Sequence, residues 1–232
     1  MKTWLRGWLL FGMLLAAGCQ AAPAAAPRPT PVVLSIQYTP TVRSLLPRLH
    51  DCAGGLKEAG IVVEERLSSR LDSSQADLIL RFGEPAEASL TASLLGWDDV
   101  VLVVNRSAGM DSISLEQLQA LYQKDRLAGP GEFQALTYPA GDDLRAVFDR
   151  LLLQGKTVSG SLPVAADAAA MLEMLAASPQ AVGFIRASDI NESVKRVAIT
   201  PSEAEIKNQP VLALTRGEPR DALHELVVCL QK

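Results

Sequence analysis

The sequence predicts an α/β protein in which largely parallel sheets are flanked by helices. Strand-like and helix-like segments alternate along most of the chain, which is the pattern that builds such layers. One strand segment is nearly all apolar, as expected of a strand that is buried on both faces. The composition agrees with a globular protein, since 48% of the 232 residues are hydrophobic and 21% are charged.

The first part of the fold is expected to open with a strand and a helix. Residues 32–38 (VVLSIQY) have a strand pattern. Residues 41–56 place apolar side chains three and four positions apart and end at two glycines, which predicts a helix that Pro47 bends or divides. Three further strands are expected at residues 61–67, 76–83 and 98–105.

The second part is expected to contain more helix. Ser114 is a candidate N-cap for a helix over 114–123, and Asp167 for one over 167–179. Two acidic residues open the amphipathic run at 142–153, which predicts another helix. The remaining expected elements are strands at 133–139, 181–188, 194–199 and 210–217, and a closing helix at 218–232.

Residues 1–18 are predicted to be a signal peptide that ends just before Cys19. A basic start precedes the apolar stretch WLLFGMLLAA, which is short for a bilayer span. The ending AAGC resembles the bacterial lipobox, in which the cysteine sulfur is acylated, although Ala16 stands where that motif usually has leucine. An ordinary secretory peptide cut near Cys19 is the alternative. Residues 19–30 are rich in Ala and Pro, and we expect them to form an extended tether.

Charge and motifs exclude several functions. The formal charge is −4, and removal of Lys2 and Arg6 with the signal peptide lowers it to about −6, so nucleic acid is not an expected partner. The chain has two histidines and lacks the HExxH, CxxC, P-loop and GxSxG motifs. We therefore expect no enzymatic activity, no metal and no cofactor.

Four segments resemble the phosphate-type, class II periplasmic solute-binding proteins of ABC transporters. Residues 98–123 match a crossover strand that ends in Val-Asn, followed by a short turn and a helix. Residues 165–190 match a late helix followed by a Pro-x-Ala-Ile-Gly-Tyr strand, here PQAVGF. The other two segments are residues 38–49 (YTPTVRSLLPRL) and 75–85 (QADLILRFGEP). The likeness extends over residues 31–232.

The resemblance implies a two-lobed, periplasmic-binding-protein-like fold of type II, with mixed, mostly parallel sheets flanked by helices and a ligand cleft between the lobes. Lobe one is expected to comprise residues 31–104 and 190–232, and lobe two residues 105–189. This division puts Cys52 and Cys229 in one lobe, where a disulfide is within reach. Two buried free thiols are the alternative.

The phosphate-binding relatives meet the oxyanion with a Gly-Ser-Gly-Thr-Arg motif at the start of a lobe-two helix, and the segment GDDLR aligns with this motif. Gly141 and Arg145 match it, while Asp142, Asp143 and Leu144 replace the serine, the second glycine and the threonine. A carboxylate about 4 Å from an anion repels it by roughly 4 kcal/mol at an effective dielectric constant of 20. Attraction between the anion and the helix N-terminus offsets only about 0.3–1 kcal/mol of this repulsion. Phosphate is therefore not expected to bind deeply.

Gly141, Asp142, Asp143 and Arg145 remain candidate ligand-binding residues. Capping of the helix is the alternative for the two acidic residues, because a carboxylate at the N-cap satisfies free backbone N–H groups.

Hydroxyl groups at the first strand-to-helix junction are the candidate contacts from lobe one. Tyr38, Thr39 and Thr41 lie there, although Thr41 is also a natural helix-capping residue. Arg81 ends a buried strand and either faces an anion or pairs with Glu84.

Together these features predict a membrane-anchored extracytoplasmic solute-binding protein of an ABC-type importer, with an altered oxyanion motif. Its expected partners are a small-molecule or ion ligand, the membrane and an ABC permease, and we expect a monomer. The alternative is a binding-fold lipoprotein that acts as a sensor or partner-binding module without a transport role. Trp97, which precedes the crossover strand, is expected to pack in the core.

Overall fold

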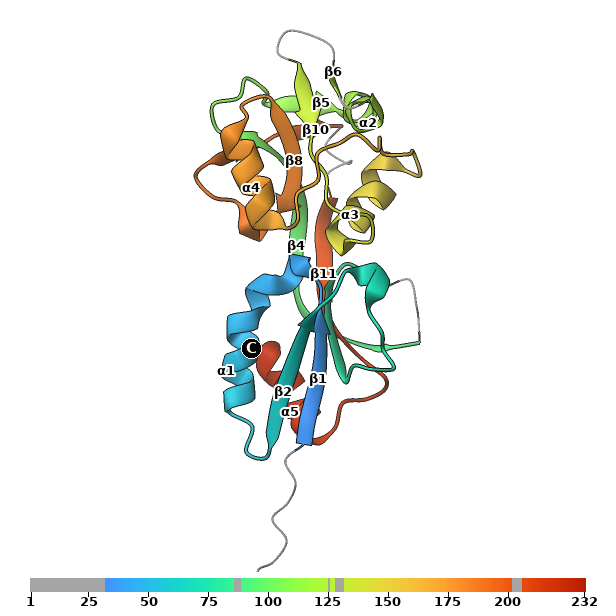
Figure 1. Ribbon diagram of the computed structural model, residues 1–232, viewed down its shortest axis with the longest axis vertical. Helices are drawn as coiled ribbons and strands as arrows, with labels where there is room; N and C mark the ends of the chain where they lie inside the picture. The colour runs from blue at the N-terminus through green and yellow to red at the C-terminus, as the bar shows by residue number, and fades with distance from the viewer. Residues whose placement is uncertain (1–31, 86–88, 125, 128–131, 202–205) are drawn as a thin grey trace, which may run out of the picture. The chain divides into compact units, whose positions relative to one another are not determined.

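The computed structural model describes residues 32–85, 89–124, 126–127, 132–201 and 206–232. The predicted signal peptide, Cys19 and the tether lie outside these residues. Within the described part, strands alternate with helices that flank a mixed sheet (Figure 1), so the predicted α/β class is confirmed.

Eleven strands are assigned within the described residues. They are β1 (Val32–Tyr38), β2 (Ala59–Glu65), β3 (Leu78–Phe82), β4 (Thr91–Asn105), β5 (Ser112–Ser114), β6 (Arg126–Leu127), β7 (Phe133–Ala135), β8 (Ala181–Arg186), β9 (Val194–Arg196), β10 (Ala198–Thr200) and β11 (Ile206–Thr215). The main sheet has the order β2-β1-β3-β11-β4-β8-β7-β6, with β9 also paired to β4, and β5 pairs separately with β10.

The helices of the described chain are short and follow their sequence signals. They are α1 (Leu46–Gly54), α2 (Leu115–Lys124), α3 (Asp143–Phe148), α4 (Ala168–Ala177) and α5 (Asp221–Leu230). The predicted helix at 41–56 is divided into a 3₁₀ turn, Pro40–Leu45, and α1, because Pro47 lacks an N–H donor and fits only the first turn of a helix. The predicted helix at 142–153 is α3 followed by a π-helical turn, Asp149–Leu153.

Two long strands connect the two halves of the sheet. β1 pairs in parallel with β2 and β3, and β7 pairs in parallel with β8. β4 and β11 are antiparallel to each other, and they also pair with β8 and β3 respectively. We call β1–β3 with α1 and α5 (residues 32–82 and 221–230) the β1 half. The β8 half is β6–β8 with α2, α3 and α4 (residues 115–186), and Figure 1 shows β4 and β11 running through both halves.

The β1 half is cross-linked at its helices. Cys52 of α1 and Cys229 of α5 form a disulfide with a Cα–Cα distance of 5.8 Å, so the alternative of two free thiols does not apply. The bond closes a loop between residues 177 positions apart in the sequence.

The β8 half is built around buried aromatic rings. Phe148 of α3 stacks on Phe184 of β8, with ring centroids 3.9 Å apart and an angle of 9° between the rings. Tyr122 and Tyr138 pack around this pair, and all four side chains are at most 2% exposed. Because this stack fixes the C-terminal end of α3 on the sheet, it also fixes where the N-terminal end of α3 lies.

One core prediction is wrong. Trp97 is 60% exposed rather than buried. The crossover strand starts at Thr91 instead of residue 98 and pairs with β11 over this stretch, so Trp97 lies within β4 instead of before it.

Candidate functional site

The start of α3 is a capped helix end that begins at a glycine. Gly141 has φ of +89°, and a Cβ atom built there would lie 2.1 Å from the Oγ atom of Ser69, so the position requires glycine for two reasons. Asp142 is the N-cap residue, and its side chain accepts a hydrogen bond of 3.0 Å from the Arg145 N–H. The capping interpretation therefore holds for Asp142.

Asp143 has a different role, because its carboxylate reaches into the β1 half. It accepts a hydrogen bond of 2.6 Å from the Thr39 hydroxyl, another from the Thr41 hydroxyl, and a third of 2.8 Å from the Phe82 N–H. The Leu144 N–H adds a local donor at 3.0 Å. Asp143 is completely buried, so these bonds are formed out of contact with solvent.

The three donors from the β1 half lie where an α/β sheet normally binds its ligand. β1 has a parallel neighbour on each side, β2 and β3, so the strand order reverses there. In open α/β sheets, ligands bind outside the carboxyl ends of the strands at such a reversal. Thr39 follows the end of β1 and Phe82 ends β3, so the carboxylate of Asp143 occupies this position.

Little space remains at the start of α3. The cavity next to it has a volume of about 10 Å³, enough for one water molecule. It is lined by Pro40, Thr41, Tyr138, Asp142, Leu144, Asp167, Ala168 and Asp189. A larger groove of about 480 Å³ lies at the outer edge of the same boundary, and it is lined by Pro40, Glu64, Glu65, Arg66, Leu67, Arg70 and Ala166.

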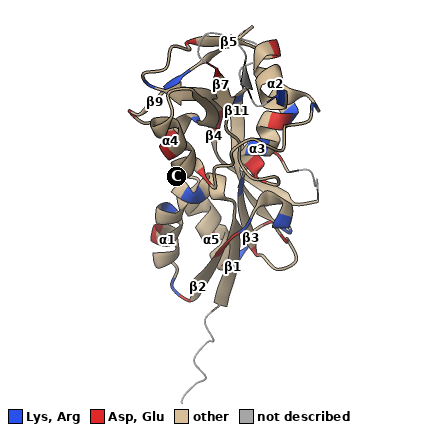
Figure 2. Cartoon of the chain, turned by 45° about the horizontal axis from the view of Figure 1, so that its top comes forward, with Lys and Arg blue, Asp and Glu red and all other residues tan. Residues whose placement is uncertain are grey.

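The two neighbouring acidic residues create an unusual electrostatic environment. The pKa of Asp142 is raised to about 7, mainly by burial and secondly by the adjacent carboxylate of Asp143. Burial also raises the pKa of Tyr138 well above its usual value. The hydroxyl group of Tyr138 is buried without a hydrogen-bond partner in the part of the chain that the structure describes. Figure 2 marks the acidic residues at the start of α3 in red.

Additional polar contacts join the two halves around Asp143. The carbonyl oxygen of Gly141 accepts hydrogen bonds from the Ser68 hydroxyl at 2.7 Å and from the Ser69 N–H at 3.2 Å. Arg43 forms an ion pair with Asp167, the N-cap residue of α4, and also binds Glu65 at 2.8 Å. The Gly141 contacts and the Arg43–Asp167 ion pair thus tie the two halves together.

A further tie starts from β8. Arg186 donates to the Ser44 hydroxyl at 2.9 Å and also forms an ion pair of 2.8 Å with Asp189. Because Ser44 belongs to the turn that follows β1, this arginine links the end of β8 to the β1 half.

The other predicted site residues are less directly involved. Arg145 donates to the Tyr138 carbonyl at 2.8 Å and to Asp149 at 3.3 Å, so its guanidinium group serves α3 itself. Tyr38 lies close to Glu65, outside the cluster around Asp143, and burial raises its pKa.

Arg81 is a partly buried cation. It forms no ion pair with a described residue, Glu84 included, and its one hydrogen bond there is a long one of 3.4 Å to the Phe82 carbonyl. Burial lowers the pKa of Arg81, and the nearby negative charge of Asp143 opposes that change. Arg81 therefore contributes a positive charge near the Asp143 carboxylate.

Sequence reasoning missed the backbone donor of Phe82 and the cross-boundary ties of Arg43 and Arg186. A backbone N–H carries no residue signature, so no sequence signal could have identified it. The position of Phe82 at the end of a strand was the nearest indication.

The described residues lack both a metal-binding cluster and a membrane-spanning helix. They contain no cluster of three or more His, Cys, Asp or Glu side chains arranged to hold a metal ion. They also contain no helix that is both long and apolar enough to span a bilayer.

Known structures share this fold. An ABC-type phosphate transport receptor from Vibrio cholerae is similar over 86% of this chain and 93% of that one, with a TM-score of 0.67 and 19% identity. A putative phosphate ABC transporter substrate-binding protein from Clostridium perfringens, solved with bound phosphate, is similar over 85% and 92%, with a TM-score of 0.68 and 13% identity.

A regulatory protein shares the fold as well. The reduced regulatory domain of OxyR from Pseudomonas aeruginosa is similar over 87% of this chain and 98% of that one, with a TM-score of 0.59 and 14% identity. No family model matches the chain, and no curated protein matches it in sequence. The chain therefore has the two-lobed fold of type II periplasmic binding proteins and in this fold resembles the phosphate-binding proteins of ABC transporters.

Proposed function

We propose that the chain is an extracytoplasmic, lipid-anchored protein of the solute-binding fold that serves as a sensor or partner-binding module, with its own Asp143 in the ligand position. The observation that carries this proposal is the set of hydrogen bonds that Thr39, Thr41 and the Phe82 N–H donate to Asp143. Hydroxyl and backbone N–H donors of this kind also bind oxyanions. A carboxylate attached to the other half therefore acts as a built-in anion.

Space and charge both argue against a phosphate carrier. The cavity at the start of α3, lined by Thr41 and Asp142, has a volume of about 10 Å³, which fits one water molecule but not an ion with five heavy atoms. A phosphate about 4 Å from the Asp143 carboxylate would be repelled by roughly 4 kcal/mol at an effective dielectric constant of 20. A carrier must open and close around its solute, whereas Asp143 holds the two halves of this chain together in place of a solute.

The proposed location rests on the N-terminal sequence. Residues 1–18 are proposed to be removed as a signal peptide, Cys19 to be acylated, and residues 19–30 to link the folded part to the membrane. Each buried CH₂ group of an acyl chain contributes about 0.8 kcal/mol to anchoring. Labelling of cells with radioactive palmitate tests this proposal. The wild-type chain should take up label and Cys19→Ala should not, whereas equal labelling of both would contradict lipid attachment at Cys19.

A second candidate function is solute binding for an ABC-type importer, with a permease as partner and a ligand other than phosphate. The observation that favours it is the groove of about 480 Å³, a volume typical of small-molecule sites. Glu64, Glu65, Arg66 and Arg70 line this groove, so a ligand there would be polar or charged.

Thermal unfolding with a panel of solutes separates the two candidates. A ligand present at 100 times its dissociation constant stabilises the folded state by about 2.7 kcal/mol. The partner-binding proposal expects no shift with phosphate, sulfate, molybdate, amino acids, polyamines or sugars. A shift with an amino acid, polyamine or sugar supports the second candidate, while a shift at sub-micromolar phosphate contradicts the assignment of Asp143 as a built-in anion.

A further inference from the structure

The two carboxylates at the start of α3 are unequally served by hydrogen bonds. Asp143 accepts four hydrogen bonds, three of them from the β1 half. Among the described residues, Asp142 accepts one well-formed hydrogen bond, from the Arg145 N–H, and the Leu144 N–H and the Thr41 hydroxyl also act to lower its pKa. Both side chains are buried, at 2% exposed or less. A second negative charge beside Asp143 would thus be poorly compensated.

No cation pairs with Asp142 in the described part of the chain, and the nearest one without an ion pair, Arg81 of β3, acts on Asp143 instead. The titratable or charged groups that face it are Asp143 on its own helix, Tyr138 from the segment before α3, Asp167 of α4, and Asp189 of the turn after β8. Asp167 and Asp189 have cations of their own, Arg43 and Arg186. The guanidinium group of Arg145 is bound to the Tyr138 carbonyl and to Asp149. The Thr41 hydroxyl, from the turn after β1, is the neutral neighbour.

We propose that Asp142 is a proton-binding group that controls how readily the two halves separate, an inference that rests on the proposed closure by Asp143. With a proton on Asp142, the start of α3 keeps one negative charge, on Asp143, and the three donors from the β1 half hold the halves together. Loss of that proton places two adjacent negative charges in a buried site. Separation relieves this repulsion, because it exposes both carboxylates to water.

The sign of the effect follows from proton linkage. The pKa of Asp142 is about 7 in the closed form, against an ordinary value of 3.8 that applies once the group is in water. Because the pKa of Asp142 is raised in the closed form, this carboxyl group stabilises the closed form fully below pH 3.8, and the stabilisation is lost as the pH rises towards 7. Between these values, the equilibrium constant for opening should rise about tenfold per pH unit. From pH 5 to pH 7 the expected increase is about fiftyfold, because Asp142 is already half ionised at pH 7.

Hydrogen exchange at the Phe82 amide measures this opening directly, because that N–H is bonded to Asp143. The full chain is compared at pH 5.0 and 7.0 after correction for the intrinsic exchange rate. In the wild type, the opening constant at Phe82 should rise about fiftyfold. The amide of Ile36, in the middle of β1, reports global unfolding, which also exposes Asp142 to water. Its opening constant should therefore rise by a similar factor but stay well below that of Phe82 at both pH values.

Matched variants identify the group that is responsible. Asp142→Asn keeps a good N-cap but binds no proton, so its opening constant should change less than about threefold over the same pH range. Asp51→Asn removes the same charge from the exposed side of α1 and should behave like the wild type. If Asp142→Asn does not fold, Asp142→Ser replaces it, since serine is also a strong N-cap.

Three results would overturn the inference: a wild-type change at Phe82 below threefold, opening constants at Phe82 and Ile36 that are equal, or an unaltered pH response in Asp142→Asn. Addition of phosphate at pH 5.0 tests the underlying function separately. Increased protection of the Phe82 amide by micromolar phosphate would contradict the built-in anion, whatever the pH response.

Discussion

Asp143→Ala should separate the two halves and create a site for an added anion. The change removes the acceptor for the Thr39 hydroxyl, the Thr41 hydroxyl and the Phe82 N–H. Each buried donor that loses its partner costs about 1–3 kcal/mol, so the three together cost at least about 3 kcal/mol if the site stays closed. Water can reach the donors if the halves open, so part of the loss should appear as opening rather than unfolding.

The assay is urea unfolding at pH 5.5, where Asp142 is mostly protonated because its pKa is about 7. Asp143→Ala should lose at least about 3 kcal/mol relative to the wild type. Sulfate or phosphate should restore stability in this variant, by about 2.7 kcal/mol at 100 times the dissociation constant, and should leave the wild type unchanged. A loss below about 0.5 kcal/mol together with no response to either anion would refute the assignment.

Three other changes have defined outcomes. Gly141→Ala should lower the free energy of unfolding in urea by about 1–3 kcal/mol, because φ at this position is +89° and the Ser69 side chain occupies the space of a Cβ atom. An unchanged free energy of unfolding would show that the turn can relax. Replacement of both Cys52 and Cys229 by serine should cost about 5 kcal/mol from the long loop they close, and an unchanged melting temperature would contradict this. Asp142→Asn should raise the free energy of unfolding at pH 8 by up to about 4 kcal/mol and have little effect near pH 4. The reason is that the raised pKa of Asp142 makes the wild type lose stability as the pH rises. A variant whose stability depends on pH as that of the wild type does would contradict the electrostatic account.

Local signals were sufficient for much of the fold. The alternation of strands and helices predicted the α/β class, and the acidic residue after Gly141 predicted the cap that Asp142 provides. Element ends were less predictable because pairing partners determine them. β4 starts at Thr91 because β11, far along the chain, pairs with it there, and this also explains why Trp97 was wrongly placed in the core.

The role of Asp143 could not be predicted from the sequence pattern. Its partners Thr39, Thr41 and Phe82 lie 104, 102 and 61 residues away, and one of them contributes only a backbone N–H. The sequence did indicate that two acidic residues disfavour an oxyanion at this helix end. It did not indicate that one of the two carboxylates would turn across the boundary and take the place of that anion.

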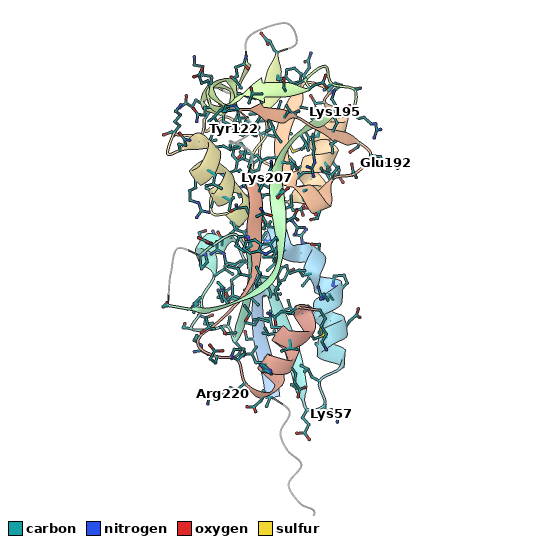
Figure 3. The ribbon with its side chains drawn as sticks, turned by 180° about the vertical axis from the view of Figure 1, so that it is seen from behind. Lys57, Tyr122, Glu192, Lys195, Lys207 and Arg220 are labelled. Atoms are coloured by element: carbon teal, nitrogen blue, oxygen red, sulfur yellow. A yellow bond between two sulfur atoms is a disulfide. The ribbon has the colours of Figure 1, made fainter. Side chains whose placement is uncertain are left out.

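The distance between the two halves is the most direct test of the built-in anion. Spin labels are attached as cysteines at Lys57 and Glu192 in a chain that carries Cys19→Ala. Both positions are exposed, and Figure 3 shows Lys57 at the lower end of the fold and Glu192 at the side of its upper part. Pulsed dipolar spectroscopy at pH 5.5 should give one narrow distance in the otherwise wild-type chain, unchanged by 1 mM phosphate (on the order of a saturating dose). A broad distribution that narrows when phosphate is added would contradict the account.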